Sequence, residues 1–361
     1  MKNTDLRVLL NPAKIIPHYI NRKSQANSNP PIAVEFHWCT TCNYNCVHCS
    51  YAQRRKKYSV LSQEIVEQTV KDLIDMKVKA VYFSGGGEPT TYKNWDKYAQ
   101  EFLDNNIETA LITNSVPIQE NQYKLLKKFN YIAVSVYSTD EAEYKQITGS
   151  NNFEKQFALP SKLNSKNENV IVGARCVINN INYKNIINTY KKAIEEGFDY
   201  IIFIPAVDYE NKKIDLSDEI KEFVKNIINQ NKDIINPVKT NLLGLGEKGI
   251  QHYKHHNGDK FSSYEGCFCA QLRTNAFINY DGNIYLCQPL IGQEEYSIGN
   301  LNNNTFREIW NSKRHQEVID KLNKRFISGT CIDCRSISHN MKIKEYQENN
   351  IMPDCPQDSF V

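Results

Sequence analysis

Three closely spaced cysteines form the most distinctive chemical pattern of the chain. Cys42, Cys46 and Cys49 have a C-x3-C-x2-C spacing and follow a short apolar run that is typical of a β-strand. Three thiolates on one tight loop suit an iron–sulfur cluster, because its irons prefer soft sulfur ligands. A cluster with only three protein ligands leaves one iron open to a small molecule, whereas a closed cage of four thiolates transfers electrons.

Two other interpretations of this array stay open at this point. Cys39 could add a fourth thiolate and complete a zinc site, or the thiols could be buried without any ligand. Cys39 lies at the end of the predicted strand, so we expect it to be a bystander. We therefore predict an iron–sulfur cluster on Cys42, Cys46 and Cys49.

A second group of cysteines lies near the C-terminus. Its members are Cys267, Cys269, Cys287, Cys331, Cys334 and Cys355. Cys269 and Cys287 flank a predicted hairpin, and Cys331 and Cys334 form a C-x2-C pair after a predicted helix, so four thiolates can converge on one metal centre. Spacing alone does not choose between zinc and a second iron–sulfur cluster, nor between Cys267 and Cys269 as a ligand.

The elements that must position these cysteines alternate between strands and helices from residue 31 to about residue 235. Nearly continuous apolar runs predict six strands, as in a parallel sheet covered by helices: Ala33–His37, Ala80–Ser84, Thr109–Thr113, Ile132–Val136, Val170–Val177 and Tyr200–Pro205. Helical spacing of apolar residues predicts helices at Ser62–Met76, Trp95–Leu103, Gln122–Phe129, Tyr183–Ile194 and Ser217–Ile228. Because a full barrel has eight βα units, we expect an α/β fold with a partial (β/α)6 TIM-like barrel.

The alternation of strands and helices ends at about residue 235, which predicts that a separate domain follows the barrel. Asp281-Gly282 between two apolar runs predicts a hairpin with a type I′ turn, and residues Thr305–Leu322 predict a helix. We expect an N-terminal extension (1–30), the barrel (31–235), a connector (236–266), a small cysteine-rich domain (267–340) and a tail (341–361).

The segments that follow the predicted strands are candidate ligand contacts, because active sites of parallel α/β proteins lie at the carboxyl ends of the strands. The second strand leads into Ser84-Gly85-Gly86-Gly87-Glu88-Pro89. Its glycines let the backbone approach a ligand closely, and Glu88 offers an acceptor for an ammonium group. The segment matches neither a P-loop nor the dinucleotide-binding glycine pattern, so taken alone it is a weak signal.

Composition and charge exclude several classes of protein. The chain has 361 residues, of which 40% are apolar and 24% charged, so it can bury a sizeable core. A formal net charge of +3 is too small to indicate nucleic acid or an anionic membrane as the main partner. We see no signal-peptide core, and no apolar stretch approaches the roughly 20 residues that span a bilayer. We expect a cytoplasmic protein whose 11 cysteines serve metal or redox chemistry rather than disulfides.

The cysteine loop after the first strand resembles the cluster loop of the radical S-adenosylmethionine (SAM) enzymes. The resemblance extends over residues 32–205. In that family a [4Fe-4S] cluster binds SAM at its fourth iron and cleaves it reductively, which gives a 5′-deoxyadenosyl radical. The resemblance therefore implies a [4Fe-4S] cluster, SAM and a reducing electron donor such as flavodoxin or ferredoxin.

The same resemblance implies a set of SAM-binding residues. They are His48, Gly86, Gly87, Glu88, Pro89, Asn114, Ser135 and Arg175. The segment 86–89 is similar to the family's Gly-Gly-Glu-Pro, and Asn114 lies in a segment similar to Thr-Asn-Gly. Ser135 begins a segment similar to the ribose-contacting Ser-x-Asp, in which Tyr137 replaces Asp. His48 corresponds to a ring near the adenine, or is a core histidine. Arg175 meets the SAM carboxylate, or is a surface or salt-bridged arginine.

The C-terminal cysteines resemble the auxiliary-cluster domain of radical SAM enzymes known as SPASM or twitch. The resemblance includes Ser297-Ile298-Gly299-Asn300-Leu301 and Glu308-Ile309-Trp310. A full SPASM domain has further cysteines after the C-x2-C pair and holds two clusters, whereas this shorter pattern is similar to the single-cluster twitch form. It implies one auxiliary [4Fe-4S] cluster on Cys269, Cys287, Cys331 and Cys334.

The resemblance implies an oxidoreductase-type enzyme that abstracts a hydrogen atom from an unactivated C–H bond. Many peptide-modifying relatives begin with an extra peptide-binding domain, whereas about 30 residues precede the first strand here. We therefore expect oxidation of a small hydroxylated substrate, similar to a carbohydrate or an aminocyclitol. The alternatives are cross-linking, epimerisation or oxidation of a ribosomally made peptide or a protein side chain, and a non-catalytic zinc-binding protein.

Overall fold

A computed structural model describes most of the chain. The described residues are 4–5, 14–18, 29–52, 57–207, 213–248, 269, 271–328, 331, 337–350 and 360. Cys267, Cys334 and Cys355 lie outside them, and so do residues 249–266 of the predicted connector.

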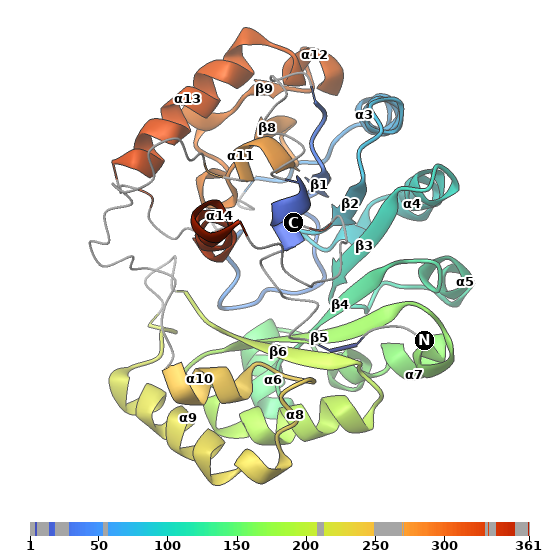
Figure 1. Cartoon of the computed structure of the whole chain (residues 1–361). Helices are drawn as coiled ribbons and strands as arrows, with labels where there is room; N and C mark the ends of the chain where they lie inside the picture. Colours follow the sequence, from blue (N-terminus) through green and yellow to red (C-terminus); the bar gives the residue numbers. More distant parts are fainter. Residues whose placement is uncertain are drawn as a thin grey trace.

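One nine-stranded sheet organises the molecule (Figure 1). Its first six strands are β1 (Ala33–Phe36), β2 (Ala80–Phe83), β3 (Glu108–Thr113), β4 (Tyr131–Val136), β5 (Ile171–Ile178) and β6 (Tyr200–Pro205). These strands pair in parallel in the order β6-β5-β4-β3-β2-β1. In the described part of the chain β6 forms one end of the sheet and does not pair with β1, so the predicted partial barrel is confirmed.

Helices follow the strands and cover the convex side of the sheet, where Figure 1 shows α3, α4, α5 and α7 in a row. The helices up to residue 248 are α3 (Gln63–Asp75), α4 (Trp95–Asp104), α5 (Tyr123–Leu126), α6 (Glu141–Thr148), α7 (Leu159–Leu163), α8 (Ile186–Glu195), α9 (Asp218–Gln230) and, in the predicted connector, α10 (Leu242–Lys248). The predicted N-cap of α3 is confirmed, because the Ser62 hydroxyl accepts a hydrogen bond from the Ile65 amide.

The strands alternate between a face that packs on the helices and a face that lines the inside of the barrel. In β1, Val34 and Phe36 belong to the main apolar core together with Val66 and Val70 of α3. Glu35 lies between them, so its side chain points to the opposite face of the sheet. This alternation places polar side chains inside the barrel.

The C-terminal domain continues the same sheet. It contains α11 (Gln271–Thr274), β7 (Asn275–Ile278), β8 (Asn283–Tyr285), β9 (Gly299–Asn300), α12 (Phe306–Trp310), α13 (Lys313–Ile327) and α14 (Ile337–Asn349). Strand β7 pairs in parallel with β1, while β8 and β9 follow in antiparallel order. The cysteine-rich domain is therefore attached to the barrel through backbone hydrogen bonds of its first strand.

Two local predictions for this domain are wrong. The hairpin is present, but only Gly282 has a positive φ, of 86°, so its turn is not type I′. The Asp281 carboxylate accepts hydrogen bonds from Asn279 and from the Asn283 amide, and these favour a longer loop that ends on Gly282. The predicted helix over Thr305–Leu322 is broken after Trp310, because the Ser312 hydroxyl caps a new helix by accepting from the His315 amide.

Candidate active site

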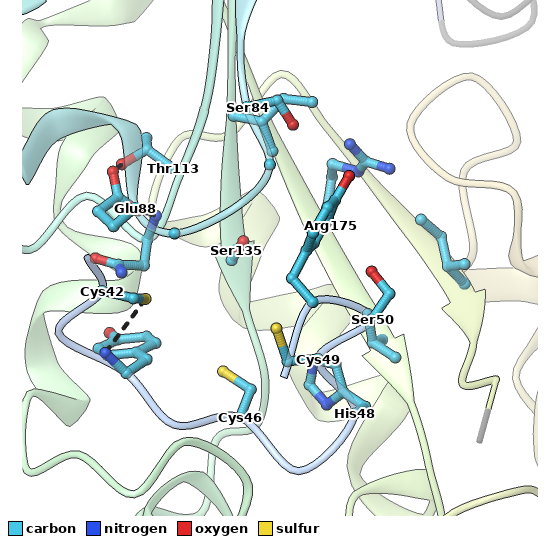
Figure 2. Close-up of a pocket in the computed structure, with 18 of the residues that line it drawn as sticks. Cys42, Cys46, His48, Cys49, Ser50, Ser84, Glu88, Thr113, Ser135 and Arg175 are labelled. Carbon is cyan, nitrogen blue, oxygen red and sulfur yellow. Dashed lines mark hydrogen bonds between the residues drawn. The ribbon is translucent and has the colours of Figure 1, made fainter. Parts of the chain in front are cut away.

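A pocket of about 420 Å³ lies at the carboxyl ends of the barrel strands (Figure 2). Its lining includes Cys42, Cys46 and Cys49, and it also includes the predicted SAM contacts His48, Gly86, Gly87, Glu88, Asn114, Ser135 and Arg175. Pro89 is buried outside the lining, where its carbonyl accepts a hydrogen bond from the Trp38 indole at 3.0 Å. The fold thus gathers side chains from many strand ends into one cavity.

The cluster loop, residues 39–52, is held by backbone hydrogen bonds. The Asn45 and Val47 amides donate to the carbonyls of Thr148 and Ile147, at 2.8 and 2.9 Å. The three cysteines are of intermediate exposure, and Figure 2 shows their sulfur atoms on the cluster-loop side of the pocket. Cys39 is 2% exposed and is not part of the pocket lining.

The donor set of the pocket fits a cluster better than a single metal ion. Within the described residues, no three Cys, His, Asp or Glu side chains are arranged to hold one ion. An iron–sulfur cube is larger than a single ion, so it takes thiolates that lie further apart. Three soft thiols on one wall and an open cavity opposite them are what a cluster with a free iron needs.

Residues 84–89, which we call the glycine segment, pack directly against the cluster loop. The Gly87 and Glu88 amides each donate a 2.8 Å hydrogen bond, to the carbonyls of Cys39 and Thr41. A Cβ atom on Gly87 would lie 2.0 Å from the Thr41 carbonyl oxygen, and Gly86 has a φ of +63°. This close contact explains why glycine is needed here, and it fixes the glycine segment beside the cysteines.

Glu88 ties the ends of β2 and β3 together. One of its oxygens accepts from Thr113 Oγ1 at 2.6 Å and from the hydroxyl and amide of Thr90, at 2.7 and 3.2 Å. The other accepts from the Asn114 amide at 2.7 Å. Burial raises the pKa of Glu88, although these hydrogen bonds oppose the shift. Its carboxylate therefore organises the loop, and its predicted contact with the SAM ammonium stays a prediction.

Asn114, Ser135 and Arg175 line the same pocket as the cysteines. The Asn114 amide group donates to Asn43 Oδ1 at 2.8 Å, which links the end of β3 to the cluster loop. Ser135 and Arg175 are paired residues of β4 and β5. Arg175 is of intermediate exposure in the pocket lining, and its contact with the SAM carboxylate stays a prediction.

The His48 ring also lines the pocket. It lies 5.5 Å from the Tyr137 ring, and its Nδ1 atom is buried without a hydrogen-bond partner in the described structure. Burial lowers the pKa of His48 to about 4. The imidazole is therefore neutral at neutral pH, which suits a ring that packs beside an uncharged base.

One buried polar pair inside the barrel was not predicted from the sequence. Glu35 Oε1 lies 2.7 Å from His37 Nε2, and the two residues are 3% and 0% exposed. Burial raises the pKa of Glu35, but the His37 charge and hydrogen bonds from His37, Tyr82 and Ser84 lower it overall. The available signal was that Glu35 in β1 and His37 directly after it alternate with apolar residues. Ser84 connects this pair to the pocket lining.

The second cysteine group is described in part. Burial raises the pKa of the Cys331 thiol to about 11, and Cys269 adds to this shift. Asn340 Nδ2 donates to Cys269 Sγ at 3.9 Å, and Cys287 directly precedes a short 3-10 turn after β8. Cys334 lies outside the described residues, so the four-cysteine ligand set stays a prediction.

Family models match both parts of the chain. The model of the Radical SAM superfamily matches residues 38–220, and the model of an iron-sulfur cluster-binding domain, SPASM, matches residues 267–335. None of the helices in the described ranges has the length and apolar character needed to cross a membrane.

Relatives extend over both domains. The chain is 24% identical over 322 residues to a cysteine-type anaerobic sulfatase-maturating enzyme of Clostridium novyi, which covers 78% of this chain and 79% of that enzyme. The structure of anSMEcpe with bound AdoMet and the Cp18Cys peptide is similar with a TM-score of 0.57 and 20% identity, over 88% of this chain and 96% of that one.

A similar fold occurs in SuiB of Streptococcus suis bound to its precursor peptide SuiA. The TM-score is 0.58 and the identity 19%, over 79% of this chain and 65% of that one, so our chain spans about two thirds of SuiB. The superfamily model matches half of the residues of this chain, and the SPASM model matches the region after them. This chain therefore belongs to the radical SAM superfamily, with a C-terminal SPASM domain and with [4Fe-4S] clusters and SAM as its cofactors.

Proposed function

We propose that this radical SAM enzyme modifies a side chain of a peptide or protein. The observation that carries the enzymatic part is the single pocket in which Cys42, Cys46 and Cys49 lie beside the glycine segment. The substrate class is supported by the Clostridium novyi sulfatase-maturating enzyme, whose similarity covers 78% of this chain.

These relatives favour the peptide alternative over the small hydroxylated substrate that we expected. That expectation depended on the short segment before the first strand. The anSMEcpe chain bound to the Cp18Cys peptide is covered to 96% by this chain, so a related chain of similar extent binds a peptide. A peptide substrate therefore does not require an extra domain before the first strand.

We assign the cluster to Cys42, Cys46 and Cys49. When bound, the cluster and SAM supply one-electron cleavage of SAM and abstraction of a substrate hydrogen atom. The glycine segment and Asn114 hold the cluster loop in place through the hydrogen bonds to Cys39, Thr41 and Asn43. The chain thus contributes a preformed site, which lowers the cost of ordering the ligands.

SAM is proposed to lie along the remaining pocket wall. Arg175 offers a guanidinium to its carboxylate, Ser135 a hydroxyl to its ribose, and the neutral His48 ring a surface for its adenine. Val177 and Ile204 add apolar side chains to the pocket wall, which helps to exclude water from the reacting atoms.

We also retain the domain boundaries at 31–235 and 267–340, the auxiliary-cluster ligands and a flavodoxin or ferredoxin donor as proposals.

The test is release of 5′-deoxyadenosine from SAM by the anaerobically reconstituted full chain with dithionite. The reaction is run with the Cp18Cys peptide, with a library of short synthetic peptides, and with aminocyclitols. Faster release with a peptide, together with a mass change in that peptide, supports the proposal. Faster release with an aminocyclitol and with no peptide would return us to the small-substrate alternative.

A further inference from the structure

A tyrosine hydroxyl contacts one of the cluster cysteines. Tyr137 directly follows β4, and its hydroxyl oxygen lies 3.5 Å from Cys46 Sγ. Tyr137 is 6% exposed and packs with Tyr44, Tyr144 and Ile147 in a small core that Cys42 and Cys46 also contact. We call Tyr44, Tyr137 and Tyr144 the tyrosine bed of the cluster loop.

The chemistry of the two atoms decides which of them donates. A cysteine that binds iron is a thiolate, so Cys46 Sγ can only accept once the cluster is bound. A neutral phenol has a hydroxyl proton to donate, so Tyr137 is the partner that can donate to Cys46 Sγ at 3.5 Å.

The other two tyrosines of the bed do not share this contact. Their hydroxyls form a hydrogen bond with each other. Tyr44 contacts a cysteine through its backbone instead, because its amide donates to Cys42 Sγ at 3.4 Å. Tyr144 therefore offers a matched comparison, with a buried phenol in the same bed whose partner is another tyrosine.

We propose that Tyr137 is a positioning residue that donates a hydrogen bond to the Cys46 thiolate and raises the reduction potential of the SAM-binding cluster. The proposal rests on the proposed function in one respect, namely that Cys42, Cys46 and Cys49 hold that cluster. Reduction adds negative charge to the cluster and its thiolates, and a donor aimed at a thiolate stabilises this added charge. Tyr137 thus makes the cluster easier to reduce.

The test is a redox titration of reconstituted full-length protein, followed by electron paramagnetic resonance, for wild type, Tyr137→Phe and Tyr144→Phe. The SAM-binding cluster is the one whose signal changes when SAM is added. At a fixed solution potential we expect the ratio of reduced to oxidised cluster to fall about fivefold in Tyr137→Phe, from the loss of one hydrogen bond. Tyr144→Phe and the auxiliary cluster should keep the wild-type potential.

An unchanged potential in Tyr137→Phe with full iron content would overturn the proposal, and so would an equal shift in Tyr144→Phe. If Tyr137→Phe loses iron, 3-fluorotyrosine placed at position 137 keeps the shape and is a stronger donor, so it should shift the potential upward. No shift there also overturns the proposal. Failure of the proposed function is distinguishable, because wild type would then contain no cluster whose signal responds to SAM.

Discussion

At the scale of single residues, Glu88 shows how one buried carboxylate organises an active-site loop. Its four hydrogen bonds come from Thr90, Thr113 and Asn114, which lie at the ends of two neighbouring strands. Each of these donors would be buried without a partner if the carboxylate were removed. A buried donor without a partner is more costly than a lost surface contact.

We expect Glu88→Ala to lower the free energy of unfolding by about 3 kcal/mol, because several buried donors lose their acceptor. Glu88→Gln keeps one carbonyl oxygen and should lose less. Urea denaturation of the cluster-free protein measures both, with the exposed Glu120→Ala as control, expected within about 0.5 kcal/mol of wild type. Equal urea midpoints for Glu88→Ala and Glu120→Ala would contradict this role.

His48 gives a prediction about pH. Its folded pKa of about 4 lies below the usual value of 6.5, so the unfolded chain binds the proton first as the pH falls. The contribution of the neutral His48 to the free energy of unfolding is thus fully present above pH 6.5, and it is lost as the pH falls from 6.5 to about 4. We expect His48 to contribute about 1 kcal/mol per pH unit to this loss. Urea denaturation at pH 6.5 and 5 should show a smaller loss for His48→Gln, and an identical loss would refute the assignment.

Residues tied to strand ends could be predicted from the sequence, and long-range pairs could not. Asn114 directly follows β3 and Arg175 lies in β5, so the strand order places both in the pocket lining, while their contacts with SAM stay predictions. The contact between Tyr137 and Cys46 joins residues 91 positions apart, and local spacing carries no information about it. Glu35 and His37 were missed because only the fold shows that both side chains of this buried polar pair face inward.

At the scale of elements, the site depends on two loops that touch through backbone atoms. The segment after β2 packs on the cluster loop after β1, and no side chain fits between them at Gly87. The cysteines and the predicted SAM contacts are therefore positioned as one unit.

We expect Gly87→Ala to weaken SAM binding at least tenfold, because its Cβ would force the Thr41 carbonyl and the cluster loop away. Equilibrium binding of SAM to the reconstituted protein measures this effect, and iron content is determined alongside. Gly244→Ala is the control, since a Cβ there meets nothing within 4 Å and the residue lies in α10. Wild-type SAM affinity in Gly87→Ala would show that the two loops are not coupled.

The regular elements of the barrel were predicted well, because their apolar runs are long and continuous. All six strands appear within a residue of the expected bounds. The errors occur where a side chain accepts a hydrogen bond from a backbone amide and so changes the local structure. The Asp281 carboxylate sets the hairpin loop, and the Ser312 hydroxyl starts a new helix where apolar spacing alone predicted a continuous one.

At the scale of the whole molecule, the barrel and the SPASM domain share one sheet. Besides the pairing of β7 with β1, the Arg307 amide donates to Asp72 Oδ2 at 3.0 Å, and the Trp310 indole donates to the Asn29 carbonyl at 2.8 Å. These bonds join residues more than 230 positions apart. Loss of either domain would expose a strand edge of the other.

We therefore expect the two domains to unfold in one transition. Trp310→Phe leaves Trp38 and Trp95 as fluorescent reporters of the barrel, and the Trp38→Phe/Trp95→Phe double variant leaves Trp310 as reporter of the SPASM domain. In each variant the urea midpoint by fluorescence should equal the midpoint by circular dichroism. A fluorescence midpoint that departs from the circular dichroism midpoint would show independent domains.

The central claim is that Cys42, Cys46 and Cys49 hold the cluster that cleaves SAM. The most direct measurement is iron and sulfide content after anaerobic reconstitution, with 5′-deoxyadenosine release under dithionite, for wild type and the triple Cys→Ala variant. We expect about eight irons in wild type and about four in the variant, which keeps only the auxiliary cluster and releases no 5′-deoxyadenosine. Zinc in place of iron in the wild type, with no cleavage of SAM, would contradict the claim.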